Sequence, residues 1–573
     1  MRQLKELVRR NALLILFICV AYLPFLGFRL VRTAGDEKVY ITQALEMAKN
    51  GTLFLQSLGG VPDYYKGPAH YVLIQLGLKI FGLNLWSVLY MNFAFVLMGA
   101  VAIAELIRNV FPQKKHWAFW AGAFFAFNVG VSGHLFTSQM EAELVGFYGL
   151  GFFLLWRSKN WQGDLAFWIV AGICGWFKSP LHSVLIGLSA LLFWAWTGEV
   201  WRRLKDPRFL LAAVAGIVVG AIGYAPAFVM DQKNFLELYL KKETFKNSNG
   251  GPWWQAFVPM VSYYLIPFMS LAVVSYIETV ALFFSKGGRQ LNPEGKRVLK
   301  LALSGIFPTL GFFTYYFYRG ENYALPVIGP FVLLFFCLLY RAEGVFKKLR
   351  ASLLWSGTLF GLPLAGLLSA IYFRFEISGS WWPAWVIPLA WFLVLVMVAG
   401  VVWDHKKKEN GLGYGVAVSG LSLILVLNLA LFVFGEMEVY QLRERIHADR
   451  NAGETYRVSY WNLNRLIWNE SGLMSVSVGE PITALYHEKD LLEAIRNGDL
   501  ILGRDTDVGK EIAALAAKHF PDLEPVTYPW DRWKTHAADG SGNSLIPQAW
   551  KQRDLSLLFD HALILRFKPR PKG

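Results

Sequence analysis

Residues that could carry catalysis are concentrated near the start of the sequence. Asp36 and Glu37 are adjacent, and Lys66 follows in the stretch DYYKGPAHY, residues 63–71. A carboxylate can act as the general base that takes a proton from an attacking hydroxyl. An ammonium group held on a Gly-Pro turn is a compact point charge suited to a phosphate. These residue types therefore point to acid–base chemistry beside an anionic group.

Each of these residues also has a purely structural interpretation, which the local sequence leaves open. Asp36 and Glu37 favour a helix N-terminus, and Lys66 could extend its ammonium group to a membrane surface. Tyr64 and Tyr65 are typical of a lipid–water interface, but they could equally stack on a sugar or donate to a phosphate. The choice depends on where the segment lies in the fold.

Three further charged residues stand at the ends of apolar segments. Glu141 and Glu143 occur in TSQMEAELVGFYG, residues 137–149, and Lys178 occurs in FKSPLH, residues 177–182. Charges at membrane depth are costly, which makes all three functional candidates, although a position at the outer interface would reduce that cost. The histidines nearby lack metal-ligand spacing, and we expect ordinary interface residues at His70, His134 and His182.

The elements that must position these residues are predicted to be membrane-spanning helices. Of the 573 residues, 55% are hydrophobic and 17% are charged, and the mean hydropathy is +0.37. A span needs roughly 20 mostly apolar residues, and such segments recur up to about residue 435. The first is expected to be an anchor, because no small-residue cleavage site follows it. The thirteen predicted spans cover about residues 11–31, 86–108, 117–134, 139–156, 164–177, 180–197, 208–230, 258–284, 298–317, 323–340, 352–373, 382–403 and 412–435.

Lysine and arginine are concentrated in alternate loops between these spans, and such loops tend to stay in the cytoplasm. The pattern places the N-terminus inside and, with an odd number of spans, Lys66 and the C-terminal region outside. The net charge of +15 is explained largely by the basic loops, so no nucleic-acid partner is expected. Three cysteines lie in predicted spans far apart in sequence and predict neither a disulfide framework nor a zinc site: Cys19, Cys174 and Cys337.

Polar sequence is concentrated in two outward loops, about residues 32–85 and 231–257, and in a C-terminal region, 436–573. In the first loop, DEKVYITQALEMAKNG predicts a short helix along the membrane surface. In the C-terminal region, RVSYWNL, GDLILGRD and HALILRF are typical of strands, and KDLLEAIRN and GKEIAALAAKHF are typical of helices. We expect a small α/β domain there. It contains no Gly-rich phosphate loop, metal-ligand spacing or nucleophile elbow.

The order of these motifs resembles a known family. Residues 36–71 are similar to the first outward loop of bacterial GT-C glycosyltransferases, above all the lipid A aminoarabinose transferases and related protein O-mannosyltransferase-like enzymes. Five residues match that pattern: Asp36, Glu37, Tyr40, Met47 and Lys66. NSNGGPWWQAFVPM, residues 247–260, is similar to the Pro-Trp-Trp stretch of the family's second loop. YRGENYALPVIGP, residues 318–330, resembles its Tyr-x-x-Pro-x-x-x-Pro span start and adds Arg319 and Tyr323 as candidates.

The resemblance implies a GT-C fold in the inner membrane, with a periplasmic C-terminal domain and a polyprenyl-phosphate-linked sugar as donor. Lys66 would hold the donor phosphate, with Tyr64 and Tyr65 as walls of the donor site, and Asp36 would orient or deprotonate the acceptor. A divalent metal ion is an open possibility, with Asp36 and Glu141 as its ligands. The family has Glu where this chain has Tyr65, so aminoarabinose specificity is not expected to carry over.

Three other interpretations remain. The acceptor could be a protein in place of lipid A or another envelope glycolipid, as in protein O-mannosyltransferases. A transporter of lipid-linked glycans would need repeated halves and charges near the middle of the spans, and the sequence shows neither. A membrane scaffold would not require Asp36, Glu37 and Lys66 in one loop.

Overall fold

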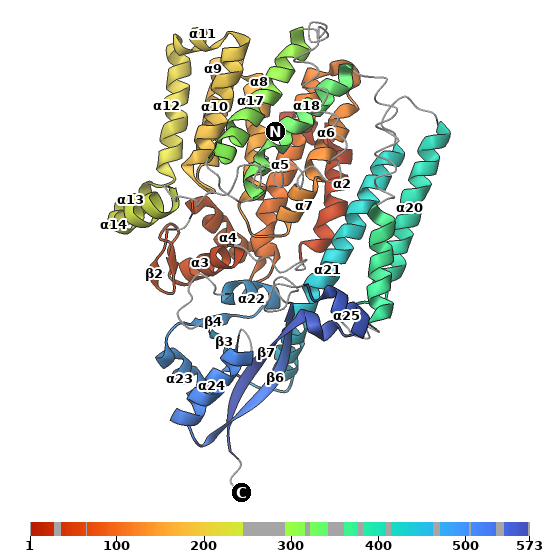
Figure 1. Ribbon diagram of the computed structural model, residues 1–573. Helices are drawn as coiled ribbons and strands as arrows, with labels where there is room; N and C mark the ends of the chain where they lie inside the picture. The colour runs from red at the N-terminus through yellow and green to blue at the C-terminus, as the bar shows by residue number, and fades with distance from the viewer. Residues whose placement is uncertain are drawn as a thin grey trace.

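The computed structural model describes residues 2–27, 36–64, 66–244, 293–315, 321–341, 360–375, 382–407, 414–461, 470–503, 506–533 and 544–570. The N-terminal part of the chain is a helical bundle, and the C-terminal part is a smaller α/β domain at one end of it (Figure 1). The expected fold class, an all-α membrane domain followed by a small α/β domain, is therefore confirmed. The predicted boundary at residue 435 stays a prediction.

Every predicted span except 258–284, which lies outside the described residues, overlaps a helix. Three described helices are long and apolar enough to cross a membrane: Trp86–Val110, Pro180–Thr197 and Val386–Trp403. Several others are apolar but shorter. The bundle helices are α1 Arg2–Arg10, α2 Ala12–Tyr22, α5 Trp86–Val110, α6 Trp117–Ala126, α7 Val129–Leu135, α8 Glu141–Arg157, α9 Trp161–Cys174, α10 Pro180–Thr197, α11 Val200–Leu204, α12 Pro207–Ile222, α17 Pro293–Tyr315, α18 Ile328–Arg341, the helix Phe360–Arg374, α20 Val386–Lys407 and α21 Tyr414–Asn451.

Two predicted spans are each divided into two helices. The segment 117–134 is broken between α6 and α7 at Asn128, whose side chain accepts from the Gly130 N–H at 2.9 Å and begins a new helix. The segment 208–230 is broken between α12 and the short α13, Ala225–Met230. Beyond α13 lie α14, Gln232–Asn234, and a π-helix, Phe235–Thr244. Hydropathy detects these apolar segments but not the backbone breaks inside them.

Small residues let the bundle helices approach one another closely, as is common between membrane helices. A Cβ added at Gly149 of α8 would lie 3.0 Å from the Cα of Gly99 in α5. Similarly, a Cβ at Gly172 of α9 would lie 2.2 Å from the carbonyl oxygen of Gly216 in α12. These contacts fix the bundle on which the candidate site is built.

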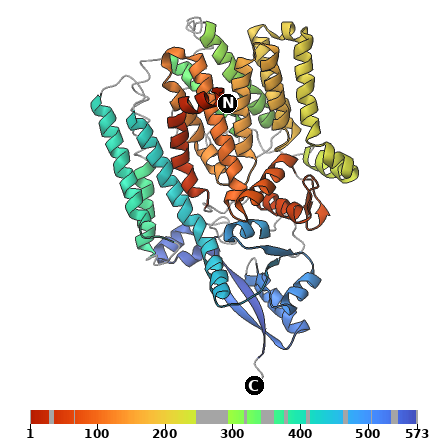
Figure 2. The ribbon, with the colours of Figure 1, turned by 180° about the vertical axis from the view of Figure 1, so that it is seen from behind.

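The described part of the first loop that was predicted to face outward, residues 36–64 and 66–85, forms a layer between the bundle and the C-terminal domain (Figures 1 and 2). It contains α3, Glu37–Lys49, a two-stranded hairpin of β1, Ser57–Leu58, and β2, Val61–Pro62, and then α4, Pro68–Phe81. The helix predicted at 36–51 is confirmed, and nine of its residues are buried, so it is covered by protein.

The C-terminal domain is built on a five-stranded sheet of order β4-β3-β5-β7-β6. Strand β3 runs parallel to β4 and β5, whereas β7 is antiparallel to β5 and β6. All three runs predicted as strands and both runs predicted as helices are confirmed. The elements are β3 Val458–Trp461, α22 Ser471–Val478, β4 Ile482–Leu485, α23 Glu488–Arg496, β5 Leu500–Leu502, α24 Thr506–His519, β6 Leu523–Trp533, α25 Ile546–Gln552 and β7 Phe559–Pro569.

The last bundle helix, α21, continues into this domain without a break. Its final turns place Val439, Leu442 and Ile446 in one buried cluster with residues of the sheet. The domain also contacts α3, because Lys38 and Glu470 form a buried ion pair at 3.6 Å and Tyr486 donates to Glu46 at 2.9 Å. The C-terminal domain is thus attached both to the bundle and to the first outward loop.

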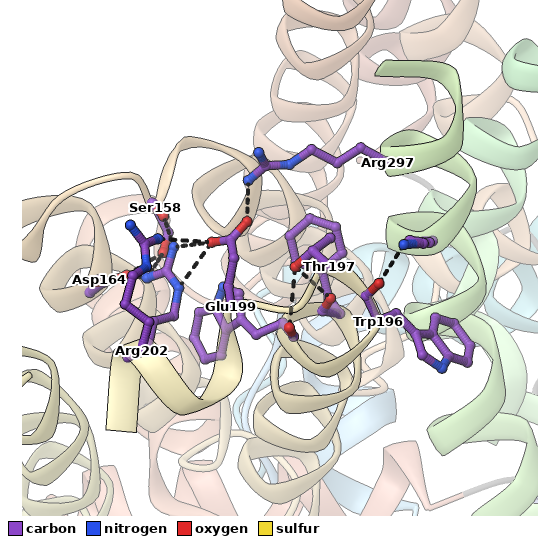
Figure 3. Close-up of polar contacts among 11 residues, drawn as sticks. Ser158, Asp164, Trp196, Thr197, Glu199, Arg202 and Arg297 are labelled. Atoms are coloured by element: carbon purple, nitrogen blue, oxygen red, sulfur yellow. Dashed lines mark hydrogen bonds and ion pairs between the residues drawn. The ribbon is translucent and has the colours of Figure 1, made fainter. Parts of the chain in front are cut away.

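The opposite end of the bundle carries a cluster of ion pairs among the predicted cytoplasmic loops. Arg203 binds Asp164 at 2.6 Å and Glu199 at 3.0 Å, and its side chain is only 7% exposed. Glu199 also meets Arg202 and Arg297, at 3.6 and 3.1 Å (Figure 3). Three basic segments that are distant in sequence therefore meet at the α11 end, away from the C-terminal domain.

Candidate active site

The Gly-Pro turn after Lys66 is hydrogen-bonded to the segment that carries Lys178. The Gly67 N–H donates to the Lys178 carbonyl at 3.4 Å, and the Ala69 N–H donates to the Trp176 carbonyl at 3.1 Å. The fit requires glycine, because a Cβ at Gly67 would lie 2.1 Å from the Trp176 carbonyl oxygen. The half-buried Lys66 is therefore held beside the start of the Lys178 segment.

Lys178 is itself paired with Glu141. The Lys178 ammonium donates to Glu141 Oε1, and both side chains are at most 10% exposed. The same ammonium lies 4.2 Å from the centre of the Tyr323 ring, which in turn packs on Phe313 of α17 at 4.9 Å. The structure thus brings together three of the predicted candidates, Glu141, Lys178 and Tyr323. The ion pair with Glu141 and the cation–π contact with Tyr323 both hold the Lys178 ammonium in place.

Asp36 and its neighbours are held at the beginning of α3. The Tyr40 hydroxyl donates to Asp36 Oδ2 at 3.3 Å. The buried Glu37 accepts a hydrogen bond from the Ser138 N–H at 2.8 Å. Since Ser138 lies three residues before Glu141, this bond ties the Asp36 segment to the start of α8. The segment that carries Asp36 and Glu37 therefore lies against the part of the bundle that carries Glu141.

His70 is a buried member of this region, not the interface residue that the sequence predicted. Its side chain is fully buried, its Nδ1 lies 2.7 Å from Glu143 Oε1, and its Nε2 lies 3.3 Å from Ser138 Oγ. The Tyr40 ring packs edge-on against it at 5.5 Å. Sequence reasoning missed this arrangement because 73 residues separate His70 from Glu143. The sequence offered only a general signal, because a carboxylate inside an apolar segment, such as Glu143, requires a polar partner without indicating which one.

Of the two other histidines, His182 is also buried and His134 is not. His182 is 1% exposed, and its Nδ1 lies 3.4 Å from the Tyr148 hydroxyl, so it too is an interior residue. His134 is partly exposed, next to the turn that precedes α8.

Tyr64 is buried beside the segment that follows α13. Its hydroxyl donates to Asp231 Oδ2 at 3.1 Å, and its ring, 2% exposed, packs with Phe235 and Tyr239. Burial raises the pKa of this hydroxyl, and the Asp231 carboxylate raises it further. Tyr64 therefore joins the segment before Lys66 to the start of the second predicted outward loop, and its role as a wall of the donor site stays a prediction. The expectations for Tyr65 and Arg319 concern residues outside the described part of the chain.

The open question of a metal ion gains no support from the ligand geometry. Among the described residues, no three His, Cys, Asp or Glu side chains come together as a metal site. Glu141 is paired with Lys178, and Asp36 receives the Tyr40 hydroxyl.

Known proteins with this architecture were found by comparison of structures. ArnT from Cupriavidus metallidurans bound to undecaprenyl phosphate superimposes with a TM-score of 0.64 over 97% of this chain and 98% of that one, at 15% identity. The apo form of the same protein gives 0.63 over 99% and 98%, also at 15% identity. The chain has the ArnT fold. The expected GT-C architecture is thereby confirmed over nearly the whole length.

A sequence relative points in the same direction as the ArnT fold. The chain is 24% identical over 383 residues to an undecaprenyl phosphate-alpha-4-amino-4-deoxy-L-arabinose arabinosyl transferase from Pseudomonas savastanoi pv. phaseolicola (strain 1448A / Race 6). The match covers 64% of this chain and 68% of that protein. No protein-family model matches the chain.

Proposed function

We propose that this protein is an inverting glycosyltransferase that moves a sugar from a polyprenyl-phosphate donor to lipid A or another envelope glycolipid. The observation that carries the proposal is the ArnT fold over 97% of the chain, with Lys66, Lys178, Glu141 and Asp36 on segments that meet at one end of the bundle. The reaction takes place on the outer face of the inner membrane in this proposal.

The departing group in such a transfer is a lipid phosphate, whose charge grows as the bond to the anomeric carbon breaks. A fixed cation beside that oxygen stabilises the transition state more than the ground state. Lys66 is suited to this role, because the hydrogen bonds of Gly67 and Ala69 hold its turn. Lys178 is less available, since Glu141 already neutralises it.

The acceptor hydroxyl attacks the anomeric carbon from the side opposite the phosphate. Its oxygen forms the new glycosidic bond while the bond to the phosphate oxygen breaks, and Asp36 takes its proton. The free lipid phosphate leaves, and the configuration at the anomeric carbon is inverted. The Tyr40 hydroxyl supports this assignment, because its bond to Asp36 Oδ2 orients the carboxylate.

Replacing Glu141 by Gln is expected to lower the transfer rate strongly while the protein still accumulates in the membrane. The substitution keeps the shape of the side chain but leaves the buried Lys178 without its charge partner, and breaking one side of a buried pair is costly. The measurement is single-turnover transfer by purified protein. Turnover within about threefold of the parent would show that the charge of Glu141 is not needed for the reaction.

The orientation is tested by reporter fusions. A reporter fused after Gly453, just beyond the end of α21, should behave as extracytoplasmic. A matched fusion after Lys205, which directly follows α11 at the opposite end of the bundle, should behave as cytoplasmic. Cytoplasmic behaviour of the first fusion would place the candidate site on the wrong side of the membrane for this proposal.

The acceptor is identified by mass spectrometry of envelope lipids from cells with and without the gene. The proposal expects a glycolipid that loses one sugar when the gene is removed. A sugar lost from membrane proteins would instead assign a protein acceptor. Unchanged lipids and proteins, together with no transfer by the purified enzyme, would contradict the proposed reaction.

A further inference from the structure

We propose that His70 is a positioning residue for the transfer reaction, and that Glu143 and Ser138 act through it. This inference rests on the proposed function for its kinetic part. The observation behind it is the hydrogen-bond chain that runs from Glu143 in α8 through His70 in α4 to Ser138, whose N–H binds Glu37 in α3. This series of hydrogen bonds connects the two segments that carry Lys66 and Asp36.

The connectivity of carboxylate, imidazole and hydroxyl is that of a serine hydrolase triad, but the surroundings exclude that chemistry. Ser138 and His70 are completely buried. The Ser138 N–H is bound to Glu37 and so cannot stabilise an oxyanion. A hydroxyl that no substrate can reach is not a nucleophile. The array therefore serves to hold backbone segments in place.

The imidazole of His70 connects two partners through its two ring nitrogens. An ionised carboxylate only accepts, so beside an ionised Glu143 the Nδ1 of His70 is the donor, while Nε2 lies within hydrogen-bond distance of the Ser138 hydroxyl. Glu143 Oε2 is buried and has no hydrogen-bond partner within the described residues. If His70 moved away, a buried carboxylate would lose its described partner, and a buried charge without its partner is strongly unfavourable. One position of the ring is thus strongly preferred.

That position determines where Lys66 and Asp36 lie. His70 is in the first turn of α4, directly after the Gly-Pro turn of Lys66. Glu37, at the other end of the chain of bonds, is adjacent to Asp36. A misplacement of about 1 Å between reacting groups can cost about 100-fold in rate. Loss of the imidazole should therefore act mainly on the chemical step.

The test compares His70→Ala and Ser138→Ala with Asn428→Ala as a matched control. Asn428 is also buried and donates to the Ala21 carbonyl at 2.8 Å, but it joins α21 to α2. We expect His70→Ala to lower kcat about 100-fold and Ser138→Ala about 10-fold, with Asn428→Ala near the parent. In a Lys66→Ala background, His70→Ala should lower kcat by less than about threefold, because residues that act as a unit are not additive.

A second measurement does not depend on turnover. Hydrogen exchange of the backbone amides of residues 66, 67 and 69, and of residues 37–43, should be at least about tenfold faster in His70→Ala and unchanged in Asn428→Ala. A parent protein without transferase activity would contradict the proposed function. The exchange experiment would still show whether His70 holds the segments of Lys66 and Asp36 in place. Unchanged exchange, a kcat within about threefold of the parent, or fully multiplicative effects with Lys66→Ala would each overturn the inference.

Discussion

Replacing Asp36 by Asn is expected to lower single-turnover sugar transfer by about 100- to 10,000-fold, the range that a positioned general base contributes. Asn has nearly the same shape and still accepts from the Tyr40 hydroxyl, so the start of α3 should stay in place. Binding of the lipid donor should remain within about threefold of the parent, since the base acts on the acceptor. The comparison of transfer with donor affinity separates these two effects.

A suitable control for this substitution is Asp206→Asn. Asp206 caps α12 at the opposite end of the bundle, where its side chain accepts from the Arg208 N–H at 2.9 Å. Asn is an equally good cap, so neither transfer nor donor binding should change. If Asp36→Asn behaves like this control, the carboxylate has only a structural role at the start of α3 and another group must take the proton.

Replacing Lys66 by Ala is expected to weaken donor binding by about 10- to 150-fold, which corresponds to the roughly 1.5–3 kcal/mol of a charge-assisted contact with phosphate. Any additional loss should appear only in turnover, because the charge on the leaving phosphate grows during the reaction. Lys66→Arg is not expected to restore full activity, since the planar guanidinium approaches a phosphate with a different geometry.

The matched control for Lys66 is Lys79→Ala, which removes an exposed lysine near the end of α4. Donor affinity should be unchanged in that variant. Equilibrium binding of the lipid donor to purified protein, followed by single-turnover transfer, measures both quantities. Equal affinities for the parent and Lys66→Ala would show that the ammonium group merely reaches the membrane surface.

The sequence was sufficient for features that depend on composition or on nearby residues. Apolar segments of span length overlap the helices of the bundle, and alternating runs predicted the strands of the C-terminal domain. The motif around Lys66 directed attention to the segment that meets Lys178. These signals are local, and the family resemblance added their order along the chain.

Features that depend on distant pairs could not be read from the sequence. The partner of His70 is set by how α4 packs on α8, and nothing near residue 70 specifies it. Tyr64 has the right chemistry to contact a sugar, but Asp231 of a later segment takes its hydroxyl. The charged composition after residue 435 suggested a boundary, yet the helix continues because main-chain hydrogen bonding does not depend on polarity.

Because α21 is unbroken, the rotation of the C-terminal domain about the helix axis depends on the number of residues in that helix. The helix has 38 residues, from Tyr414 to Asn451, and each residue turns an α-helix by about 100°. A single inserted residue near position 436 would swing the domain by that angle about the helix axis and carry Glu470 away from Lys38. Length changes at this point are therefore compatible with the fold only in steps close to whole turns, such as seven residues, which return the domain to within about 20° of its setting.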